Sequence, residues 1–374
     1  MKVLLVGMYP ADQQYSLQGF AGALKSGLSL RGCDVRLISP RVALGRAKIP
    51  RMGKWLGHAD KFVLFPQELK RAAAWADVVH LVDHGHAIYV KHLPHVPHII
   101  TCHDLIAAKA AFGELPEWAL MGTARVYQQM ILDGLRQAGH VACISEATRQ
   151  DVLRMAHVPD TQTSLIYDAL FYPYRPMPGD ESTPVVKTLG LESDAMFFIH
   201  IGRDVPTKNR DGLVKIFRVL REQCGMARAK LVLAGKPLTQ EMRQFIREQG
   251  VEDGVLELSH LSNEHLRALY SRAQALIFPS LCEGFGLPII EAQACGCPVF
   301  TSNRAPMTEV GGTAAVYFDP TQPDHAAQII AGNLDAREEQ ITAGFENVKR
   351  FTTERMVDEY LHLYQSLTNS PHER

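Results

Sequence analysis

Short runs of apolar residues alternate with segments of helical periodicity along the first half of the chain. The runs at residues 2–6, 35–38, 78–82, 98–102 and 141–144 have the length of buried strands. Between the first two runs, apolar residues recur at helical spacing over residues 17–30, and Gly32 then ends the helix. This alternation predicts a parallel sheet with helices on both faces.

The pattern restarts after a proline-rich segment at residues 172–184. Because proline disfavours both helix and central strand, we interpret this segment as an interdomain linker. Further strands are predicted at residues 197–201, 230–234, 256–258, 275–278 and 298–301, with helices beginning near Asp211, Thr239 and Leu287. Apolar residues at helical spacing over residues 354–367 predict a last helix that packs on a neighbour.

The composition is typical of two α/β domains. The chain has 374 residues, 46% of them hydrophobic, which is more than one core usually serves. Its formal net charge of -1 argues against a nucleic-acid-binding protein. Seven scattered cysteines predict no disulfide framework, and Cys295 and Cys297 are interpreted as structural. The apolar run after Met1 is shorter than a signal-peptide core, so we expect a cytoplasmic protein.

Two carboxylates flank a glycine-rich turn between Glu283 and Glu291. Gly284 and Gly286 let backbone N–H groups approach a ligand, and Pro288 suits the first turn of a helix. Such a helix start receives anions, while ionised carboxylates suit sugar and ribose hydroxyls. An ordinary turn before a helix is the alternative, since glycine-rich turns are common.

A second group of polar residues follows the predicted strand at residues 197–201. Strand ends in open α/β sheets face the ligand crevice. Arg203 can grip a diphosphate with two hydrogen bonds, and Lys208 can add a point charge. Solvated loop charges are the alternative interpretation.

The order and spacing of these motifs resemble the retaining glycosyltransferases of family 4. The family pattern is Gly-Arg, then Lys-Asn, then two glutamates eight residues apart, with a loop and helix start like residues 259–266 in between. The resemblance implies the GT-B architecture, an α/β fold of two Rossmann-like domains whose parallel sheets face a central cleft. Residues 1–172 would bind the acceptor, residues 173–350 the nucleotide sugar, and residues 351–374 would form a helix packing back on the first domain.

The resemblance also implies roles for single residues. Arg203 and Lys208 would hold the diphosphate, Glu283 the transferred sugar and Glu291 the ribose. In the first half, His103 follows a strand and resembles the family histidine that approaches the donor sugar. The catalytic contacts so implied are His103, Arg203, Lys208 and Glu283. The donor-binding positions so implied are Gly19, Gly202, Asn209, His260, Leu261, Phe285, Gly286, Leu287 and Glu291.

Two positions depart from the family pattern. The family often carries a Gly-Gly loop near the first helix, whereas this chain has Gly19 and Gly22 separated by two residues. Gly19 is assigned to the loop on this basis. Where many members have asparagine after the strand that precedes the linker, this chain has Asp168, to which we assign no role.

Neither the histidine-rich segment nor the basic segment changes this interpretation. Seven histidines fall between His80 and His103, but no flanking carboxylate or cysteine completes a metal site, and no Asp-x-Asp occurs. We therefore expect no metal and no cofactor. The basic residues from Arg41 to Lys61, with Trp55 among them, favour either a solvated loop or peripheral contact with the inner face of an anionic membrane.

The sequence thus predicts a transferase that moves a glucose- or mannose-type hexose from a UDP- or GDP-sugar to an acceptor hydroxyl with retention. The partners so predicted are a nucleotide-sugar donor and a glycan or lipid-linked glycan acceptor, without nucleic acid. A catalytically inactive subunit that keeps the fold is the alternative. An epimerase-like dinucleotide enzyme is a weaker one, since no Gly-x-Gly-x-x-Gly follows the first strand.

Overall fold

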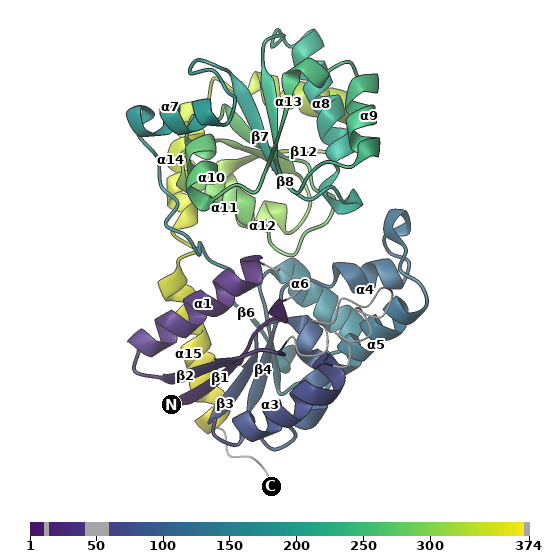
Figure 1. Ribbon diagram of the computed structural model, residues 1–374, viewed down its shortest axis with the longest axis vertical. Coiled ribbons are helices and arrows are strands. Elements are labelled where there is room, and N and C mark those ends of the chain that lie inside the picture. Colours follow the sequence, from purple (N-terminus) through teal and green to yellow (C-terminus); the bar gives the residue numbers. More distant parts are fainter. Residues whose placement is uncertain (11–14, 42–59, 370–374) are drawn as a thin grey trace. The chain divides into compact units, whose positions relative to one another are not determined.

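The structure is a computed structural model that describes residues 1–10, 15–41 and 60–369. The chain divides into two compact units, and each is described by itself (Figure 1). Unit 1 contains residues 1–171 and 352–374, and unit 2 contains residues 172–351. The last helix therefore belongs to the first unit, as the family resemblance implies.

Unit 1 is built on a six-stranded parallel sheet of order β2-β1-β3-β4-β5-β6. Because strand order reverses between β1 and β3, the carboxyl ends of these two strands flank the topological switch point of the sheet. The strands are β1 (Lys2–Val6), β2 (Asp34–Ile38), β3 (Val78–Leu81), β4 (His98–Cys102), β5 (His140–Cys143) and β6 (Thr163–Leu165).

Alternate residues of these strands enter two separate cores. Leu4 and Val6 pack with one set of helices, whereas Val3 and Leu5 pack with another, because successive side chains of a strand point to opposite faces. The helices of the first face are α3 (Phe65–Ala73), η4 (His84–His92), α4 (Ile106–Ala111), α5 (Thr123–Arg136) and η6 (Val152–Ala156). The helices of the second face are α1 (Tyr15–Leu30) and α15 (Thr353–Asn369). Shorter helices are η3 (Asp60–Leu64), η5 (Pro116–Trp118), α6 (Glu146–Asp151) and η7 (Asp160–Gln162).

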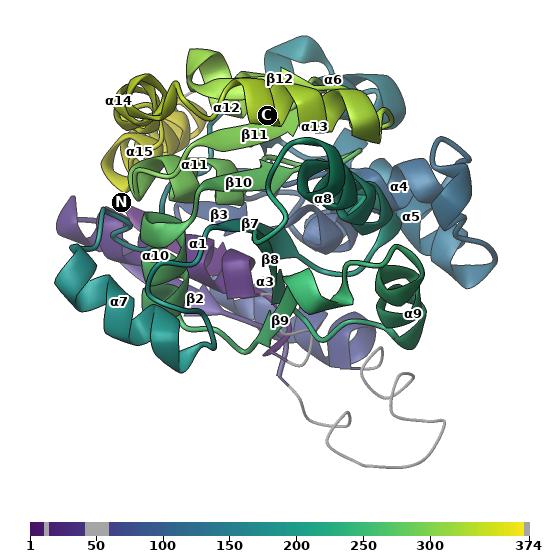
Figure 2. The same ribbon diagram turned by 90° about the horizontal axis from the view of Figure 1, so that it is seen from above.

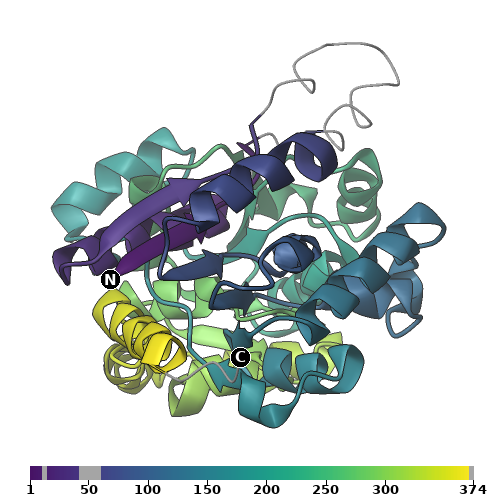
Figure 3. The ribbon, with the colours of Figure 1, turned by 90° about the horizontal axis from the view of Figure 1, so that it is seen from below.

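Helix α15 is tied to the sheet by a buried hydrogen-bond network as well as by apolar packing. It lies beside α1 in unit 1 (Figures 1 and 3). His80 Nδ1 is 2.6 Å from Tyr364 Oη, and its Nε2 is 2.7 Å from Thr101 Oγ1, which also contacts Tyr360 Oη. The prediction that the last helix packs back on the first domain is therefore confirmed.

Unit 2 carries a second six-stranded parallel sheet with a different strand order, β12-β11-β10-β7-β8-β9 (Figure 2). Numbered within the unit, this is the order of the dinucleotide-binding fold, with its switch point between β7 and β10. The strands are β7 (Phe197–Gly202), β8 (Lys230–Gly235), β9 (Val255–Ser259), β10 (Ala275–Phe278), β11 (Val299–Ser302) and β12 (Ala315–Phe318).

Helices cover both faces of this second sheet (Figure 2). One face packs on α8 (Arg210–Gln223), α9 (Gln240–Glu248) and α13 (Pro323–Gly332). Elsewhere in the unit lie α7 (Gly179–Thr188), α10 (Asn263–Arg272), α11 (Leu287–Ala294), α12 (Met307–Gly311) and α14 (Arg337–Val348), with short helices η8 (Pro206–Lys208), η9 (Glu252–Gly254) and η10 (Gly312–Ala314). The prediction of an α/β fold with two parallel sheets is confirmed.

Three local features differ from the prediction. The proline-rich segment is partly helical, because α7 runs through Pro184 and packs against α10, and these tertiary contacts offset the hydrogen bond that proline cannot donate. Strands β6 and β12 were missed. Both are short edge strands. Two of the three residues of β6 are polar, whereas β12 is a four-residue apolar run that periodicity alone does not distinguish from a buried helix segment.

Candidate functional site

The loops after β7 and β10 meet at the carboxyl edge of the second sheet, on either side of its switch point. In open α/β sheets ligands bind in the crevice at this position. The loop after β7 carries Arg203 and Lys208, and the loop after β10 carries Glu283. The two polar motifs of the sequence are therefore brought together, although about 75 residues separate them.

A partly buried ion pair joins these two loops. Lys208 Nζ lies 2.5 Å from Glu283 Oε1, with 20% of the lysine side chain and 10% of the glutamate side chain exposed. The ammonium group also lies 5.2 Å from the centre of the Phe278 ring. Because each charge is held by the other, both side chains are placed before any ligand binds, and a diphosphate would find a cation already oriented.

Hydrogen bonds to backbone groups hold the loop that carries Lys208 in place. Asn209 has a left-handed φ of 51° and caps α8 by accepting a hydrogen bond from Gly212 N at 3.3 Å. Its amide nitrogen donates to the carbonyl oxygens of Pro279 and Pro320 at 3.2 and 2.9 Å. The Leu281 N–H donates to Thr207 O at 2.7 Å. The side chain of Asn209 thus joins the loop after β7 to the segments that contain Pro279 and Pro320, at the edge of the site.

The ends of β7 and β8 approach each other unusually closely beside Arg203. A Cβ atom on Gly235 would lie 2.1 Å from Gly202 O, and the φ of Gly235 is 146°, so this position requires glycine. The buried Arg210 side chain donates from Nη2 to the same carbonyl at 2.6 Å. Arg203 itself is exposed, so its guanidinium is available to a ligand at the strand end.

Helix α11 begins where the glycine-rich motif predicts. Gly286 is its N-cap residue, with a φ of 110° that non-glycine residues rarely adopt, and a proline follows within the first turn. Phe285 is buried, and its ring packs edge-on against Phe351 at 5.5 Å between centroids. The turn that presents the Phe285, Gly286 and Leu287 amides is therefore held by packing.

Glu291 lies in α11 and is paired with a residue that the sequence motifs do not include. Tyr270 of α10 is fully buried and donates its hydroxyl to Glu291 Oε2 at 3.0 Å. Burial raises the pKa of Glu291, and the hydrogen bond from Tyr270 lowers it. Burial has the larger effect, so the pKa is raised to about 7. The carboxylate therefore changes charge near neutral pH, and Tyr270 orients it.

Two of the donor-binding positions implied by the resemblance, His260 and Leu261, directly precede α10. His260 is exposed and has a left-handed φ of 56°, and Leu261 is half-buried. Ser262 caps α10 and forms a capping box with His265. One helix thus connects the His260 turn at its start to Tyr270, the partner of Glu291, near its end.

In unit 1, His103 lies at the carboxyl end of β4 and is held on three sides. Its Nε2 is 2.9 Å from Val82 O, its Nδ1 is 3.7 Å from Asp168 Oδ2, and Phe20 packs edge-on against the ring. Burial lowers the pKa of His103, but the nearby carboxylate of Asp168 outweighs it and raises that pKa above its usual value. Asp168 is therefore a positioning residue for His103.

The structure corrects the interpretation of Gly19 as a loop residue. Gly19 lies inside α1, where a Cβ atom would be 3.4 Å from Phe171 Cβ. A side chain at this position would therefore meet Phe171 at ordinary van der Waals distance. The loop that precedes α1 falls at residues 11–14, outside the described residues.

Several histidines of the histidine-rich segment form hydrogen bonds within the protein. His98 Nδ1 contacts Val96 O at 2.8 Å and its Nε2 accepts from Gly139 N, while His80 and His103 have the contacts given above. Within the described parts of the chain, no three His, Cys, Asp or Glu side chains are grouped as metal ligands would be.

Most of the basic segment falls outside the described residues, namely residues 42–59. At its ends, Arg41 pairs with Glu68 at 3.0 Å, and Lys61 lies over the Tyr9 ring at 4.7 Å. No helix among residues 1–10, 15–41 and 60–369 is both long and apolar enough to cross a membrane.

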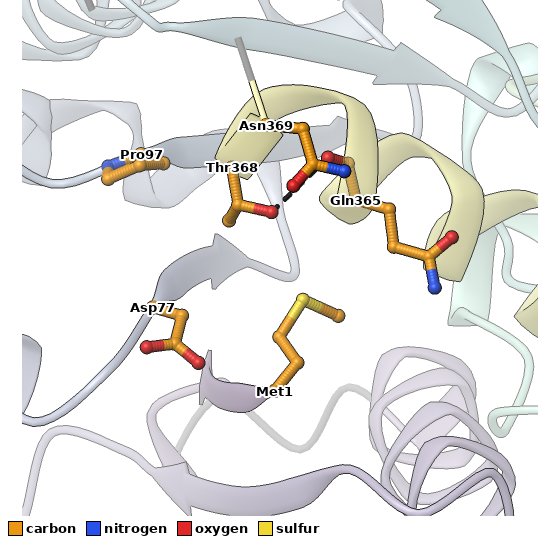
Figure 4. Close-up of a pocket in the computed structure, with 6 residues that line it drawn as sticks. All are labelled: Met1, Asp77, Pro97, Gln365, Thr368 and Asn369. Carbon is orange, nitrogen blue, oxygen red and sulfur yellow. Dashed lines mark hydrogen bonds between the residues drawn. The ribbon is translucent and has the colours of Figure 1, made fainter. Parts of the chain in front are cut away.

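A surface pocket lies at the opposite edge of the first sheet from these functional candidates (Figure 4). Residues at or just before the starts of β1, β3 and β4 line it, together with the end of α15. The lining residues are Met1, Asp77, Pro97, Gln365, Thr368 and Asn369. Ligands of open α/β sheets bind at the carboxyl edge, so this amino-edge pocket is not part of the candidate site.

Two family models match successive parts of the chain. Residues 184–343 match the model of Glycosyl transferases group 1, and residues 20–169 match that of Glycosyltransferase Family 4. The chain belongs to glycosyltransferase family 4. It is therefore a glycosyltransferase of glycan biosynthesis, and the predicted family is confirmed.

The relatives of this family 4 glycosyltransferase include bacterial polysaccharide enzymes. It is 28% identical to O-antigen chain mannosyltransferase B of Escherichia coli, over 79% of this chain and 78% of that protein. It is 24% identical to O-antigen chain mannosyltransferase RfbU of Salmonella typhimurium, over 62% of this chain and 61% of that protein.

Solved structures show the same fold over nearly the whole chain. Sucrose-phosphate synthase from Thermosynechococcus elongatus superposes with a TM-score of 0.76 at 19% identity, covering 98% of this chain and 99% of that chain. HepE of Anabaena, in complex with UDP and glucose, superposes with a TM-score of 0.75 at 15% identity, covering 98% and 100% of the two chains. The predicted two-domain GT-B fold is confirmed.

Proposed function

We propose that this glycosyltransferase moves a mannose-type hexose from a nucleoside diphosphate sugar to a hydroxyl of a growing glycan, with retention of configuration. The observation that carries this proposal is the Lys208–Glu283 ion pair at the switch point of the second sheet. A cation for the diphosphate and an acceptor for sugar hydroxyls stand side by side there. Glu291 supplies a second carboxylate suited to ribose hydroxyls.

The chemistry follows from where charge develops. When the bond between the anomeric carbon and the diphosphate breaks, negative charge accumulates on the departing phosphate oxygens. Arg203 and Lys208 stabilise that charge, which lowers the barrier without a metal ion. The acceptor hydroxyl attacks from the same face, and the departing phosphate takes its proton, so configuration is retained.

The choice of sugar rests on the relatives. The two mannosyltransferases described above match most of this chain, and both are named as O-antigen chain enzymes. We infer a mannosyl donor and a polysaccharide acceptor of that class. The base of the donor is guanine or uracil, and the exposed backbone around His260 is where it would be read.

Nucleotide binding followed by turnover tests the proposal. Thermal unfolding is measured with GDP, UDP and ADP, and then with GDP-mannose and UDP-glucose. We expect one of GDP and UDP to raise the melting temperature and its hexose conjugate to be consumed. NMR of the product would show the same anomeric configuration as the donor. An inverted product would contradict retention, and protein in excess over donor that releases no nucleoside diphosphate would contradict catalysis altogether.

We further propose that transfer needs no divalent cation, since Arg203 and Lys208 supply the positive charge that a metal would otherwise provide. Turnover after dialysis against EDTA should match untreated enzyme. Restoration of lost activity by Mg²⁺ or Mn²⁺ would overturn this part of the proposal.

A lipid-linked acceptor would bring the enzyme to a membrane surface. The basic residues between Arg41 and Lys61 would favour anionic headgroups over zwitterionic ones. Co-sedimentation with vesicles containing phosphatidylglycerol should therefore exceed that with phosphatidylcholine alone, and the difference should shrink at high salt. Equal binding to both vesicle types would remove membrane contact from the account.

A further inference from the structure

The carboxyl edge of the first sheet also has a switch point, and charged side chains gather there that the proposed donor chemistry does not use. The loops after β1 and β3 flank this point. Asp83 and His84 follow β3, and Tyr9 follows β1. Tyr9 Oη contacts Asp60 Oδ2 at 3.0 Å, which draws the start of η3 to the same edge.

Asp83 is the anchor of this group. It is 6% exposed, N-caps η4, and accepts a hydrogen bond from Gly85 N at 3.0 Å through Oδ2. Its other oxygen, Oδ1, lies 3.1 Å from His84 Nδ1. Among the described residues, His84 Nδ1 has no partner that meets the geometry of a hydrogen bond, so its contact with Asp83 is an ion pair. A buried carboxylate of this kind requires a positive partner.

His84 is that partner. Burial lowers the pKa of the His84 imidazole, but the negative charges of Asp83 and Asp104 outweigh it and raise the pKa to about 9. The ring is therefore protonated at neutral pH. Because Asp83 engages Nδ1, the Nε2–H group is the donor left for a ligand, and the side chain is 15% exposed. A protonated imidazole donates hydrogen bonds and cannot serve as a general base.

We propose that the Asp83–His84 pair is an acceptor-binding subsite in which His84 Nε2 donates a hydrogen bond to an oxygen of the acceptor saccharide. This inference rests on the proposed function, which leaves the acceptor contacts unassigned. His84 contacts substrate, and Asp83 is the positioning residue that fixes its ring and its charge. The switch point gives the location, and the ion pair supplies the chemistry.

Two substitutions of His84 separate ligand contact from folding. The amide nitrogen of asparagine takes the place of Nδ1, so His84→Asn keeps the contact with Asp83 and loses the group at Nε2. The amide nitrogen of glutamine takes the place of Nε2, so His84→Gln keeps a donor for the ligand. His95→Ala is the matched control, because His95 is exposed and precedes β4, at the amino edge of the sheet.

The experiment compares transfer to short mannan oligosaccharides with hydrolysis of the same nucleotide-sugar donor by water. Loss of a hydrogen bond to a charged donor should lower the ratio of transfer to hydrolysis about tenfold to a hundredfold in His84→Asn, mainly through the KM of the oligosaccharide. His84→Gln should recover part of this loss, and His95→Ala should equal wild type. In wild type, NMR should show the His84 ring resonance shift when the oligosaccharides are added.

Other outcomes overturn the inference. A His84→Asn enzyme with an unchanged ratio, or one that loses transfer and hydrolysis equally, would show that His84 does not contact the acceptor. A His84 resonance that does not respond to the oligosaccharides would also overturn it. Failure of the proposed function looks different, because wild type itself would then release no nucleoside diphosphate from any donor.

Discussion

The two sheets of this enzyme share parallel strands and an open edge, yet their carboxyl edges carry different chemistry. In unit 2 the edge presents a cation and glycine-rich turns, with Lys208 and Glu283 joined across the switch point. In unit 1 it presents buried pairs of histidine and aspartate, His103 with Asp168 and His84 with Asp83. The first arrangement suits a diphosphate. The second suits hydroxyl groups, because each histidine charge is matched by one aspartate, whereas the loop of Lys208 also carries the exposed Arg203.

One fold supports two kinds of site through the loops at its strand ends. Strand order determines where each crevice lies, and the loops determine what it binds. In unit 2 the close approach of Gly202 and Gly235 leaves no room for a side chain at the ends of β7 and β8. In unit 1, side chains fill the corresponding edge. The predictions below test this division, beginning with the largest effect.

Removal of the cation in unit 2 should have the largest consequence. Lys208→Ala deletes a charge that acts on the leaving group and leaves Glu283 unpaired, so turnover should fall by about 10²–10³. Circular dichroism should show an unchanged fold. Lys215→Ala is the matched control, because Lys215 is an exposed lysine of the adjacent helix α8. A Lys208→Ala enzyme with normal turnover would remove the diphosphate role from this edge.

Asp168→Asn should destabilise unit 1 in a pH-dependent way. Asp168 raises the folded-state pKa of His103, so its stabilisation is fully present below the unfolded pKa of His103 and is lost as pH rises through the folded one. The substitution should cost about 1–3 kcal/mol near pH 6 and less near pH 9. Urea unfolding of both proteins at the two pH values measures this. A cost that grows with pH would contradict the His103–Asp168 pairing.

Nucleoside diphosphate binding should strengthen as pH rises through neutrality. Burial holds the pKa of Glu291 near 7, and only the ionised carboxylate accepts hydrogen bonds from both ribose hydroxyls. Affinity should therefore increase about tenfold between pH 6 and pH 8, measured by calorimetry. Tyr270→Phe removes a hydrogen bond that favours the ionised form, so the midpoint should move to higher pH. An unchanged pH profile in Glu291→Gln would exclude Glu291 as the source.

The smallest effect is expected when the residues that cap two helices are replaced. Asn209 caps α8 at the edge of the donor site, whereas Ser145 caps α6 in unit 1. Replacement of either by alanine should cost about 1 kcal/mol of stability by urea unfolding. Only Asn209→Ala should also weaken nucleotide binding, because Asn209 also links the loops that carry Lys208 and Glu283. Equal binding by the two variants would show that the cap does not position the site.

Much of the fold could be predicted from the sequence because the inner strands are continuous apolar runs. Strand β10 and helix α11 lie where the pattern places them. The edge strand β6 was missed because two of its three residues are polar, and β12 was missed because so short an apolar run is not distinguished from a buried helix segment by periodicity. Helix α7 was not predicted, because its prolines favour a linker when the local sequence is considered alone. Packing on α10 stabilises the helix in the folded protein.

Only those residues of the candidate site that belong to recognisable sequence motifs could be predicted. Lys208 and Glu283 are recognisable separately, but their ion pair depends on the order of strands in the sheet. Tyr270 gives no signal, because an apolar-facing tyrosine in a helix is typical of a core position. Asp168 likewise acquires a role only when folding places it beside His103. Asp83 and His84 are neighbours in the sequence, but their position at the switch point depends on the order of strands in the sheet.

Hydrogen–deuterium exchange with and without nucleoside diphosphate tests the division between the two edges most directly. With GDP or UDP bound, we predict protection in peptides covering residues 201–209 and 281–291, with no comparable change in peptides covering residues 82–86. Protection of the unit 1 edge alone, or of neither edge with either nucleotide, would contradict the account.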